Sequence, residues 1–382
     1  MRRGMYHRAQ FRHSGYRGKT ALRQRTQKTT EDILNQFELI DKLEQNKTLE
    51  HSEFLRLLSG DILPDEALYL KQRAREVTDR IFRRTVRIRG LIEITNVCRN
   101  NCLYCGLRKD NRNLHRYTLS GDAILECCDI GHALGFRTFV LQGGENPAIS
   151  AEHIANLVSN IHDRYSDSAI TLSLGEWDDR SLKLFRDAGA TRYLLRHETI
   201  NPAHYSRLHP DEMSRDNRLR CLHTLKRLGY QTGTGIMVGS PYQTLDNIAD
   251  DLLFMKNLKP EMIGIGPFIP HSVTPFASFR AGNLELTLRI ISILRLMFPH
   301  VNIPSTTALA TLHENGRCLG LLAGANVVMP NLSPPDLRNH YSLYDNKSAF
   351  GAESAEGLAT LSSQLAKNNL YITTEKGDYS DV

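Results

Sequence analysis

The first third of the chain contains the run Ile94-Thr95-Asn96-Val97-Cys98-Arg99-Asn100-Asn101-Cys102-Leu103-Tyr104-Cys105. Three cysteines thus follow a short apolar, strand-like segment at the spacing C-x3-C-x2-C. Iron–sulfur clusters usually take four cysteines, so three thiolates this close together would hold three irons of a four-iron cluster and leave the fourth iron open to a chelating substrate. A structural zinc site is the alternative, with His115 as fourth ligand, but such sites favour cysteine pairs separated by two residues.

The charge of the chain is uneven. The formal net charge is +6 over 382 residues, yet residues 1–30 hold nine Arg or Lys and no acid, which leaves 39 basic and 42 acidic residues in the remainder. We interpret residues 1–30 as a disordered basic extension; an organelle transit peptide and a nucleic-acid-binding arm are the alternatives.

No apolar run approaches the length of a membrane span, so we expect a cytoplasmic protein. Four cysteines outside the trio are expected to be buried thiols: Cys127, Cys128, Cys221 and Cys318.

The hydrophobic pattern changes its period along the chain. Residues 31–88 follow a helical period, with Thr30 as the first cap. Eight short apolar segments then alternate with helical stretches, which indicates parallel βαβ units. Eight units over about 240 residues predict an α/β fold, a (β/α)8 TIM-type barrel over residues 89–331 with an N-terminal helical extension and a short C-terminal extension at 332–382. An open doubly wound sheet is the alternative. The predicted strands are 90–95, 137–142, 169–174, 192–197, 231–238, 262–269, 301–307 and 325–330, and the main helices 118–134, 150–164, 178–188, 215–228, 244–257 and 283–297.

Polar residues gather just after the predicted strands, where barrel enzymes place their active sites. Gly143-Gly144-Glu145 follows the second strand. Two residues without Cβ let backbone carbonyls approach an ammonium group closely, and the carboxylate complements its charge. Arg196 and Glu198 lie two residues apart and share one face of a strand, so both are expected to face the barrel interior, where a buried Arg indicates an anionic partner.

The cysteine trio, with Gly-Gly-Glu one strand later, is typical of radical S-adenosylmethionine (SAM) enzymes. Longer stretches resemble one family among them, the HydE maturases of [FeFe]-hydrogenases, over about residues 31–345. Biotin synthase and methylornithine synthase are similar barrels. The stretches that carry the resemblance are residues 101–108 (NCLYCGLR), 171–177 (TLSLGEW), 192–199 (RYLLRHET), 264–271 (GIGPFIPH) and 324–331 (GANVVMPN).

The resemblance implies an enzyme that cleaves SAM to a 5′-deoxyadenosyl radical during assembly of the diiron subcluster of the hydrogenase H-cluster. It implies one [4Fe–4S] cluster and SAM as cofactors. The expected substrate is a small iron–carbonyl–cyanide–cysteine precursor made by HydG, and the expected recipient of the product is HydF. An external electron donor is required, and neither a membrane nor a nucleic acid is expected as a partner.

The same resemblance assigns roles to individual residues. The cluster ligands, which are also the catalytic residues, are Cys98, Cys102 and Cys105. The residues expected to bind SAM are Tyr104, Gly143, Gly144, Glu145, Ser173, Glu198 and Arg218. The residues expected to line the substrate cavity are Thr171, Arg196, Thr306, Thr307, Tyr341 and Tyr344. Taken alone, Arg218 is more simply interpreted as a solvated helix charge, and the threonines are equally well interpreted as ordinary strand formers.

Two departures from the family are visible. Some members carry a second cluster on C-terminal cysteines, whereas residues 332–382 contain no cysteine here, so we expect a single cluster. The serine that the family usually has before its glycine-acid pair is Gly143. Two other functions stay open. One is a radical SAM mutase or lyase that acts on an amino-acid-like organic substrate. The other is a non-catalytic iron–sulfur carrier or nucleic-acid binder that depends on the basic extension, residues 1–30.

Overall fold

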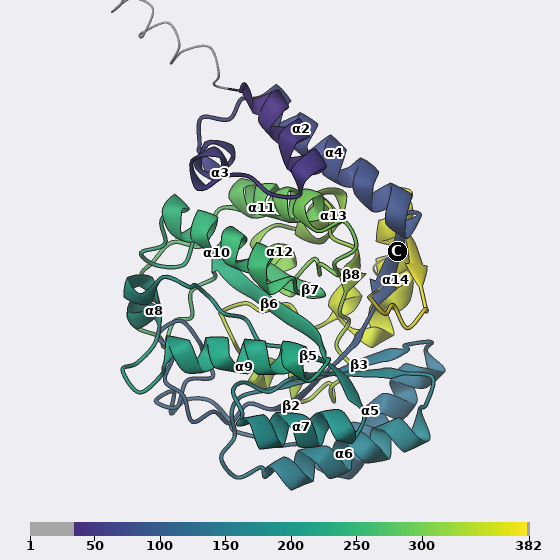
Figure 1. Ribbon diagram of the computed structural model, residues 1–382. Coiled ribbons are helices and arrows are strands. Elements are labelled where there is room, and N and C mark those ends of the chain that lie inside the picture. The colour runs from purple at the N-terminus through teal and green to yellow at the C-terminus, as the bar shows by residue number, and fades with distance from the viewer. Residues whose placement is uncertain (1–33, 380–382) are drawn as a thin grey trace, which may run out of the picture.

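The computed structural model describes residues 34–379. The predicted basic extension and the Thr30 cap lie outside this range. The first described helix, α2 (Gln36–Asn46), begins after Asn35, whose side chain accepts a hydrogen bond from the Glu38 amide. With α3 (His51–Leu58) and α4 (Pro64–Phe82) it forms a helical layer on α11 (Leu284–Met297), at the top of Figure 1.

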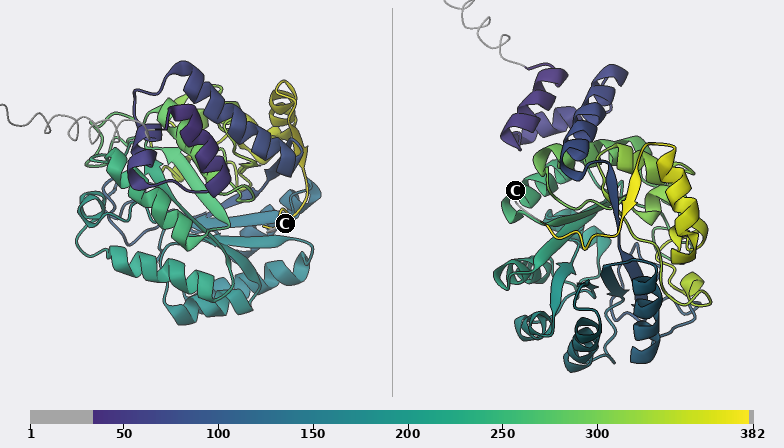
Figure 2. Two further views of the ribbon diagram at one scale, coloured as in Figure 1. Left: turned by 45° about the horizontal axis from the view of Figure 1, so that its top comes forward. Right: turned by 90° about the vertical axis from the view of Figure 1, so that its right-hand side faces the viewer.

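A parallel six-stranded sheet forms the centre of the molecule. Its strands pair in chain order, and α5 (Gly121–Ala133), α6 (Ala151–Arg164), α7 (Asp179–Asp187), α9 (Arg215–Arg227) and α10 (Leu245–Leu258) lie outside it (Figures 1 and 2). Each of these helices begins after a Ser, Thr or Asp whose side chain accepts a hydrogen bond from a backbone amide in the first turn, which is why the predicted helix boundaries are nearly right. The strands are β2 (Gly90–Thr95), β3 (Thr138–Gly143), β4 (Ala169–Ser173), β5 (Ala190–Leu194), β6 (Gln231–Val238) and β7 (Met262–Pro267).

The barrel is closed by single bridges rather than by long strands. Asn302 bridges Met262 of β7, Pro304 bridges Val327, and Leu91 of β2 bridges Asn331. The Leu332 amide donates to the Leu91 carbonyl at 2.7 Å, which completes the ring. The TIM-type barrel is therefore confirmed, but the predicted strand 301–307 is wrong, and strand 325–330 shrinks to β8 (Val327–Val328). Prolines within both segments lack the amide that a regular ladder needs.

A second, small sheet lies at the amino end of the barrel. It contains β1 (Thr85–Ile88) between β8 and β9 (Tyr371–Thr373), all parallel. Both outer strands come from the C-terminal third, so this sheet ties the two extensions together. The prediction of helix alone up to residue 88 is wrong at β1. The predicted strand 192–197 also ends early, at Leu194, because a turn and the short helix α8 (Pro202–Leu208) follow.

The remaining helices belong to the closing segments. They are α12 (Thr307–Leu312), α13 (Gly316–Leu322) and α14 (Leu358–Ala366). None of the helices between residues 34 and 379 combines the length and the apolar character that crossing a membrane requires.

Candidate active site

A cavity of about 340 Å³ lies inside the barrel, and residues from all six strands β2–β7 line it. This volume falls within the usual range for small-molecule sites. The lining residues that the sequence singled out are Cys98, Cys102, Tyr104, Cys105, Gly143, Gly144, Glu145, Ser173, Arg196, Glu198, Arg218, Thr306, Thr307, Tyr341 and Tyr344.

The three cysteines sit on the loop that follows β2. All three are free thiols and partly buried. Their loop is held by backbone hydrogen bonds to neighbouring segments, from Leu103 to the Leu208 carbonyl (3.0 Å) and from Gly106 to the Leu343 carbonyl (2.8 Å). Within residues 34–379 no three His, Cys, Asp or Glu side chains converge as the ligands of a single metal ion. A four-iron cluster does not require this, because each thiolate binds a different iron.

The environment of these thiols fits an iron–sulfur cluster. Burial raises the pKa of Cys105 to about 12 and raises that of Cys102 further. A thiolate is therefore unfavourable here unless a positive charge lies beside it, and bound metal supplies that charge. The three cysteines are thus suited to metal rather than to service as free nucleophiles.

Gly144 packs directly against the cysteine loop. A Cβ at this position would lie 2.4 Å from the Val97 carbonyl oxygen and 2.8 Å from Cys98 Cβ, and the Gly144 amide donates to the Thr95 carbonyl at 3.1 Å. Only glycine therefore fits between the loops after β2 and β3. The cysteine loop and the glycine pair form one wall of the cavity.

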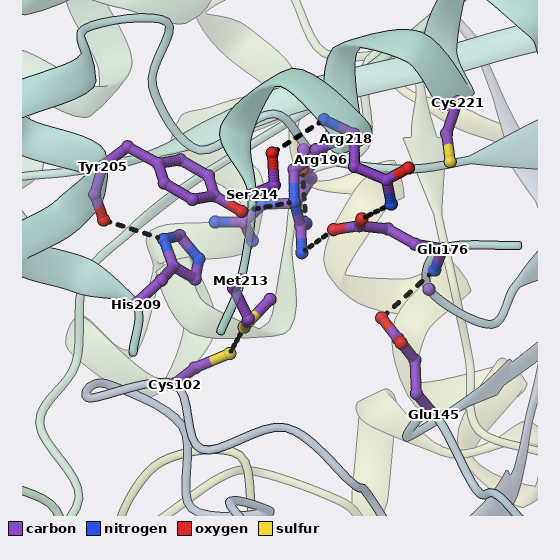
Figure 3. A network of polar contacts seen from close by, with 12 residues as sticks. Cys102, Glu145, Glu176, Arg196, Tyr205, His209, Met213, Ser214, Arg218 and Cys221 are labelled. Atoms are coloured by element: carbon purple, nitrogen blue, oxygen red, sulfur yellow. Dashed lines mark hydrogen bonds and ion pairs between the residues drawn. The ribbon is translucent and has the colours of Figure 1, made fainter. Parts of the chain in front are cut away.

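The Glu145 carboxylate has protein partners already. Oε2 accepts from Arg99 at 2.9 and 3.1 Å, and Oε1 accepts from the Glu176 amide at 3.1 Å. Its expected role was to complement a ligand ammonium group. Figure 3 shows the carboxylate directed toward the loop that carries Glu176, so it joins the loops after β3 and β4. The sequence interpretation missed Arg99 because nothing local links residues 99 and 145.

Arg218, on α9, is buried rather than solvated. Its Nη2 lies 2.9 Å from Glu176 Oε1, and its Nη1 donates to the Arg196 carbonyl at 2.9 Å (Figure 3). Burial alone would lower the pKa of Arg218, but Tyr205 and Glu176 beside it raise the pKa above its ordinary value. The guanidinium is thus a permanent, rigidly held charge at the cavity wall.

Arg196 and Glu198 face the cavity together, as the sequence predicts. Their side chains are joined by an ion pair of 2.8 Å between Arg196 Nη2 and Glu198 Oε2. Glu198 has a φ of 63°, and the Thr199 amide donates to the His197 carbonyl at 2.8 Å. Glu198 is therefore the central residue of a classic γ-turn, a strained conformation that is rare outside glycine. Thus the anionic partner that Arg196 was expected to need is, in this structure, Glu198.

Tyr104 is held by a buried histidine. Its hydroxyl lies 3.2 Å from His209 Nε2, and His209 Nδ1 lies 3.1 Å from the Tyr205 carbonyl oxygen. Because a carbonyl only accepts, Nδ1 carries the proton and Nε2 accepts from Tyr104. Burial and the nearby Arg218 charge lower the pKa of His209 to about 3, so the ring is neutral. Tyr104 and Arg218 are therefore linked through Tyr205, whose hydroxyl accepts from Arg218 Nε at 3.3 Å.

The predicted substrate residues differ in their placement. Thr306 lines the cavity and its buried Oγ1 has no hydrogen-bond partner within the described chain. Thr307 donates to Glu353 Oε2 at 3.0 Å, and the Tyr341 hydroxyl accepts from Gln142 at 3.3 Å. Thr171 is buried in the barrel and is absent from the cavity lining.

An ion pair at the cavity was missed from the sequence. Glu93 on β2 is fully buried, and its Oε1 lies 2.5 Å from Lys347 Nζ while Oε2 accepts from Asn331 at 2.9 Å. Lys347 Nζ also lies 5.1 Å from the centre of the Tyr341 ring. The sequence contained one signal, because Glu93 is the one charged residue of β2. Both charged side chains line the cavity.

The chain is similar to several known proteins in sequence and in fold. Residues 92–255 match the Radical SAM superfamily. The [FeFe] hydrogenase maturase subunit HydE of Thermotoga maritima is 45% identical over 81% of this chain and 88% of its own. The crystal structure of methylornithine synthase (PylB) superimposes with a TM-score of 0.76 at 27% identity, over 88% of this chain and 97% of that one. The structure of the [FeFe]-hydrogenase maturase HydG has the same TM-score at 17% identity, over 93% and 80%, and supports the fold alone.

The fold, the cysteine loop and the sequence identity lead to one assignment. The chain has the parallel barrel of radical SAM enzymes, with the trio and the glycine pair on one cavity wall. Identity of 45% across most of both chains is far above what a shared fold requires. The chain belongs to the radical SAM superfamily and, within it, to the family of the [FeFe] hydrogenase maturase subunit HydE.

Proposed function

We propose that this protein uses one [4Fe–4S] cluster and SAM to convert a small iron–carbonyl–cyanide–cysteine precursor during assembly of the diiron subcluster. The observation that carries the proposal is that the cysteine trio, Gly144, Glu198 and Arg218 line one cavity in a chain of the HydE family. When bound, the cluster and SAM supply one-electron chemistry that begins a radical reaction.

The chain's own residues would hold SAM in place. Cys98, Cys102 and Cys105 would hold three irons. The backbone at Gly143 and Gly144 would approach the SAM ammonium group, and Arg218, a buried fixed charge, would attract the SAM carboxylate. The ring of Tyr104, fixed by His209, would contact the adenine.

Carboxylates complete the proposed SAM site. Glu198 would accept from the ribose hydroxyls while keeping its ion pair with Arg196, and Ser173 lines the same cavity. Glu145 acts mainly by fixing the loop that carries Glu176, which in turn fixes Arg218.

The opposite part of the cavity would hold the anionic precursor. The Thr306 hydroxyl has no hydrogen-bond partner among the described residues and could donate its proton to the precursor. The Tyr341 hydroxyl accepts a hydrogen bond from Gln142 and can still donate its own proton. Arg196, Thr307 and Tyr344 line the same cavity. Thr171 would act from beneath this layer. We propose HydG as the source of the precursor, HydF as the recipient of the product, and an external protein as the electron donor.

A single cluster is part of the proposal. Residues 332–382 have no cysteine, and the cysteines outside the trio are separated from the cavity lining. Three of these four thiols are buried as expected, whereas Cys318 is partly exposed. Reconstitution should therefore give about four irons per chain; about eight would contradict the single-cluster proposal.

The test is anaerobic maturation of an apo-[FeFe]-hydrogenase with HydG and HydF, with and without this protein. We expect hydrogen evolution to require the wild type, to be lost with Cys102→Ala, and to persist with Cys318→Ala, which removes a cysteine outside the trio. Hydrogen evolution that continues unchanged when this protein is omitted would overturn the proposed role.

The alternative is an organic, amino-acid-like substrate, favoured by the 27% identity to methylornithine synthase. It predicts SAM cleavage and a rearranged or cleaved amino acid without any maturase partner. Mass spectrometry of reactions with candidate amino acids separates the two functions.

A further inference from the structure

Three arginines meet at the amino-terminal ends of the barrel strands. Arg192, on β5, is fully buried, and Arg89, between β1 and β2, is 5% exposed. Arg87, on β1, lies beside them. Burial, together with the charges of Arg192 and Arg87, lowers the pKa of Arg89 well below its ordinary value. Because guanidinium groups stay protonated in proteins, this part of the barrel holds concentrated positive charge.

The contacts of these arginines are unequal. Arg192 Nη1 donates to Thr138 Oγ1 at 2.9 Å, and its Nη2 donates to Asp378 Oδ1 at 2.8 Å. The guanidinium of Arg89 has weaker and fewer hydrogen-bond acceptors. Its Nη1 lies 3.0 Å from the sulfur of Met262, a weak acceptor, and its buried Nη2 has no acceptor among the described residues.

The C-terminal segment covers the arginines. The right-hand view of Figure 2 shows the last described residues, in yellow, crossing this end of the barrel after β9. The Lys376 carbonyl accepts from Arg192 at 3.0 Å and from Thr138 at 2.9 Å. At Gly377, whose φ is 65°, a Cβ would lie 2.7 Å from Arg87 Cδ. The segment therefore lies directly on Arg192 and Arg87, and glycine is needed for the approach to Arg87.

The charges in this region do not balance. Asp378 is the one carboxylate with an ion pair to any of the three arginines within residues 34–379. Gln231 and Lys376 also contact Asp378, so its charge is shared among several donors. A buried guanidinium without a counter-charge is strongly unfavourable, and stable proteins supply a partner. Arg89 has a buried donor but no such partner.

We propose that Arg89 and Arg192 form a binding site for a small monovalent inorganic anion, of the chloride class, closed by residues 375–379. The unpartnered Nη2 of Arg89 and the unpartnered Nε of Arg192 are its donors. Both side chains are enclosed, so only a small anion reaches them while the segment stays in place. Asp378 partly neutralises the site and competes with the bound anion.

Crystals of the full chain grown in bromide provide the direct test. An anomalous peak within hydrogen-bonding distance of Arg89 Nη2 is the expected result. Ordered water with no anomalous signal at that position would overturn the proposal.

Thermal unfolding tests the same site in solution. Chloride should raise the Tm of the wild type saturably, relative to gluconate at matched ionic strength. Arg89→Met, which keeps the packing on Met262, should lose the saturable part, and Asp378→Asn should bind chloride several-fold more tightly. If Arg89→Met fails to fold, the Asp378→Asn titration still decides: unchanged or weaker chloride binding would contradict the proposed competition.

Discussion

The Nε2 atom of His197 lies 3.4 Å from Oδ1 of Asp251, and neither side chain is exposed to solvent. His197 Nδ1 lies 2.8 Å from Thr234 Oγ1, and Asp251 Oδ1 accepts from the Ile200 amide at 2.7 Å. On the opposite side of the same backbone, Glu198 faces the cavity in its strained turn. The buried pair therefore fastens this turn to β6 and α10.

Asp251→Asn should weaken SAM binding by about ten-fold, because the γ-turn relaxes when its anchor loses the charge that orients His197. Equilibrium dialysis of the reconstituted protein measures the loss. The matched background is Glu198→Gly, in which the turn is no longer strained and the carboxylate is gone. There Asp251→Asn should cost little further affinity; an equal loss in both backgrounds would show that the anchor acts on general stability alone.

Gly144→Ala should destabilise the protein by about 1–3 kcal/mol and reduce the iron retained after reconstitution, because the added methyl group meets the Val97 carbonyl. Chemical denaturation and iron analysis measure the two effects. Gly121→Ala is the control, since nothing lies within 4 Å of a Cβ at that position. Full iron content in Gly144→Ala would refute the close approach of the two loops.

Lys347→Met should cost about 3–5 kcal/mol of unfolding free energy, because it leaves the buried Glu93 carboxylate without its cation. Burial already raises the pKa of Glu93. The double variant Glu93→Leu/Lys347→Met should recover most of the loss. Urea denaturation of the four proteins forms a double-mutant cycle, and strictly additive effects would argue against a direct pair.

Because of His209, the free energy of unfolding should fall in mild acid. Its pKa is lowered to about 3 in the folded protein, against about 6.5 for an unfolded chain. Between pH 3 and pH 6.5 the unfolded chain binds about one proton more at this histidine than the folded protein does. The stability that the neutral His209 ring contributes is therefore fully present above pH 6.5 and declines as the pH falls toward 3. The slope is at most about 1.4 kcal/mol per pH unit.

His209→Gln should flatten this slope of unfolding free energy between pH 6.5 and 4. His223→Gln, which alters an exposed histidine on α9, is the control. A slope that His209→Gln leaves unchanged would show that the ring becomes protonated in the folded state.

Local sequence signals were sufficient for most of the fold. Helix caps such as Ser150 and Ser214 mark their boundaries. Arg196 and Glu198 do share the cavity side as predicted, but both lie beyond the end of β5 at Leu194, so the γ-turn and not strand alternation places them there. The prediction of a strand at 301–307 was wrong because the apolar pattern there belongs to a buried segment that closes the barrel and is interrupted by Pro304. The short strands β1 and β9 have too few residues to show a period of two.

The site was less predictable because its partners are distant in sequence. The motifs found the trio and the glycine pair, yet the pairing of Arg218 with Glu176 and of Glu145 with Arg99 depends on loops from different strands. Lys347 reaches Glu93 across 254 positions. Periodicity carries no information at such separations, so these contacts required the folded structure.

The closing bridges of the barrel have a dynamic consequence. Between β7 and β2 the ring depends on short pairings around Asn302, Pro304, Val327 and Asn331 instead of continuous ladders. Amides in this seam should exchange with deuterium sooner than those of β3 or β4, because fewer cooperative hydrogen bonds hold them closed. Pro304 and Met329 of the seam also line the cavity. Local breathing there would admit small molecules from the side of the barrel, without any movement of the cysteine loop.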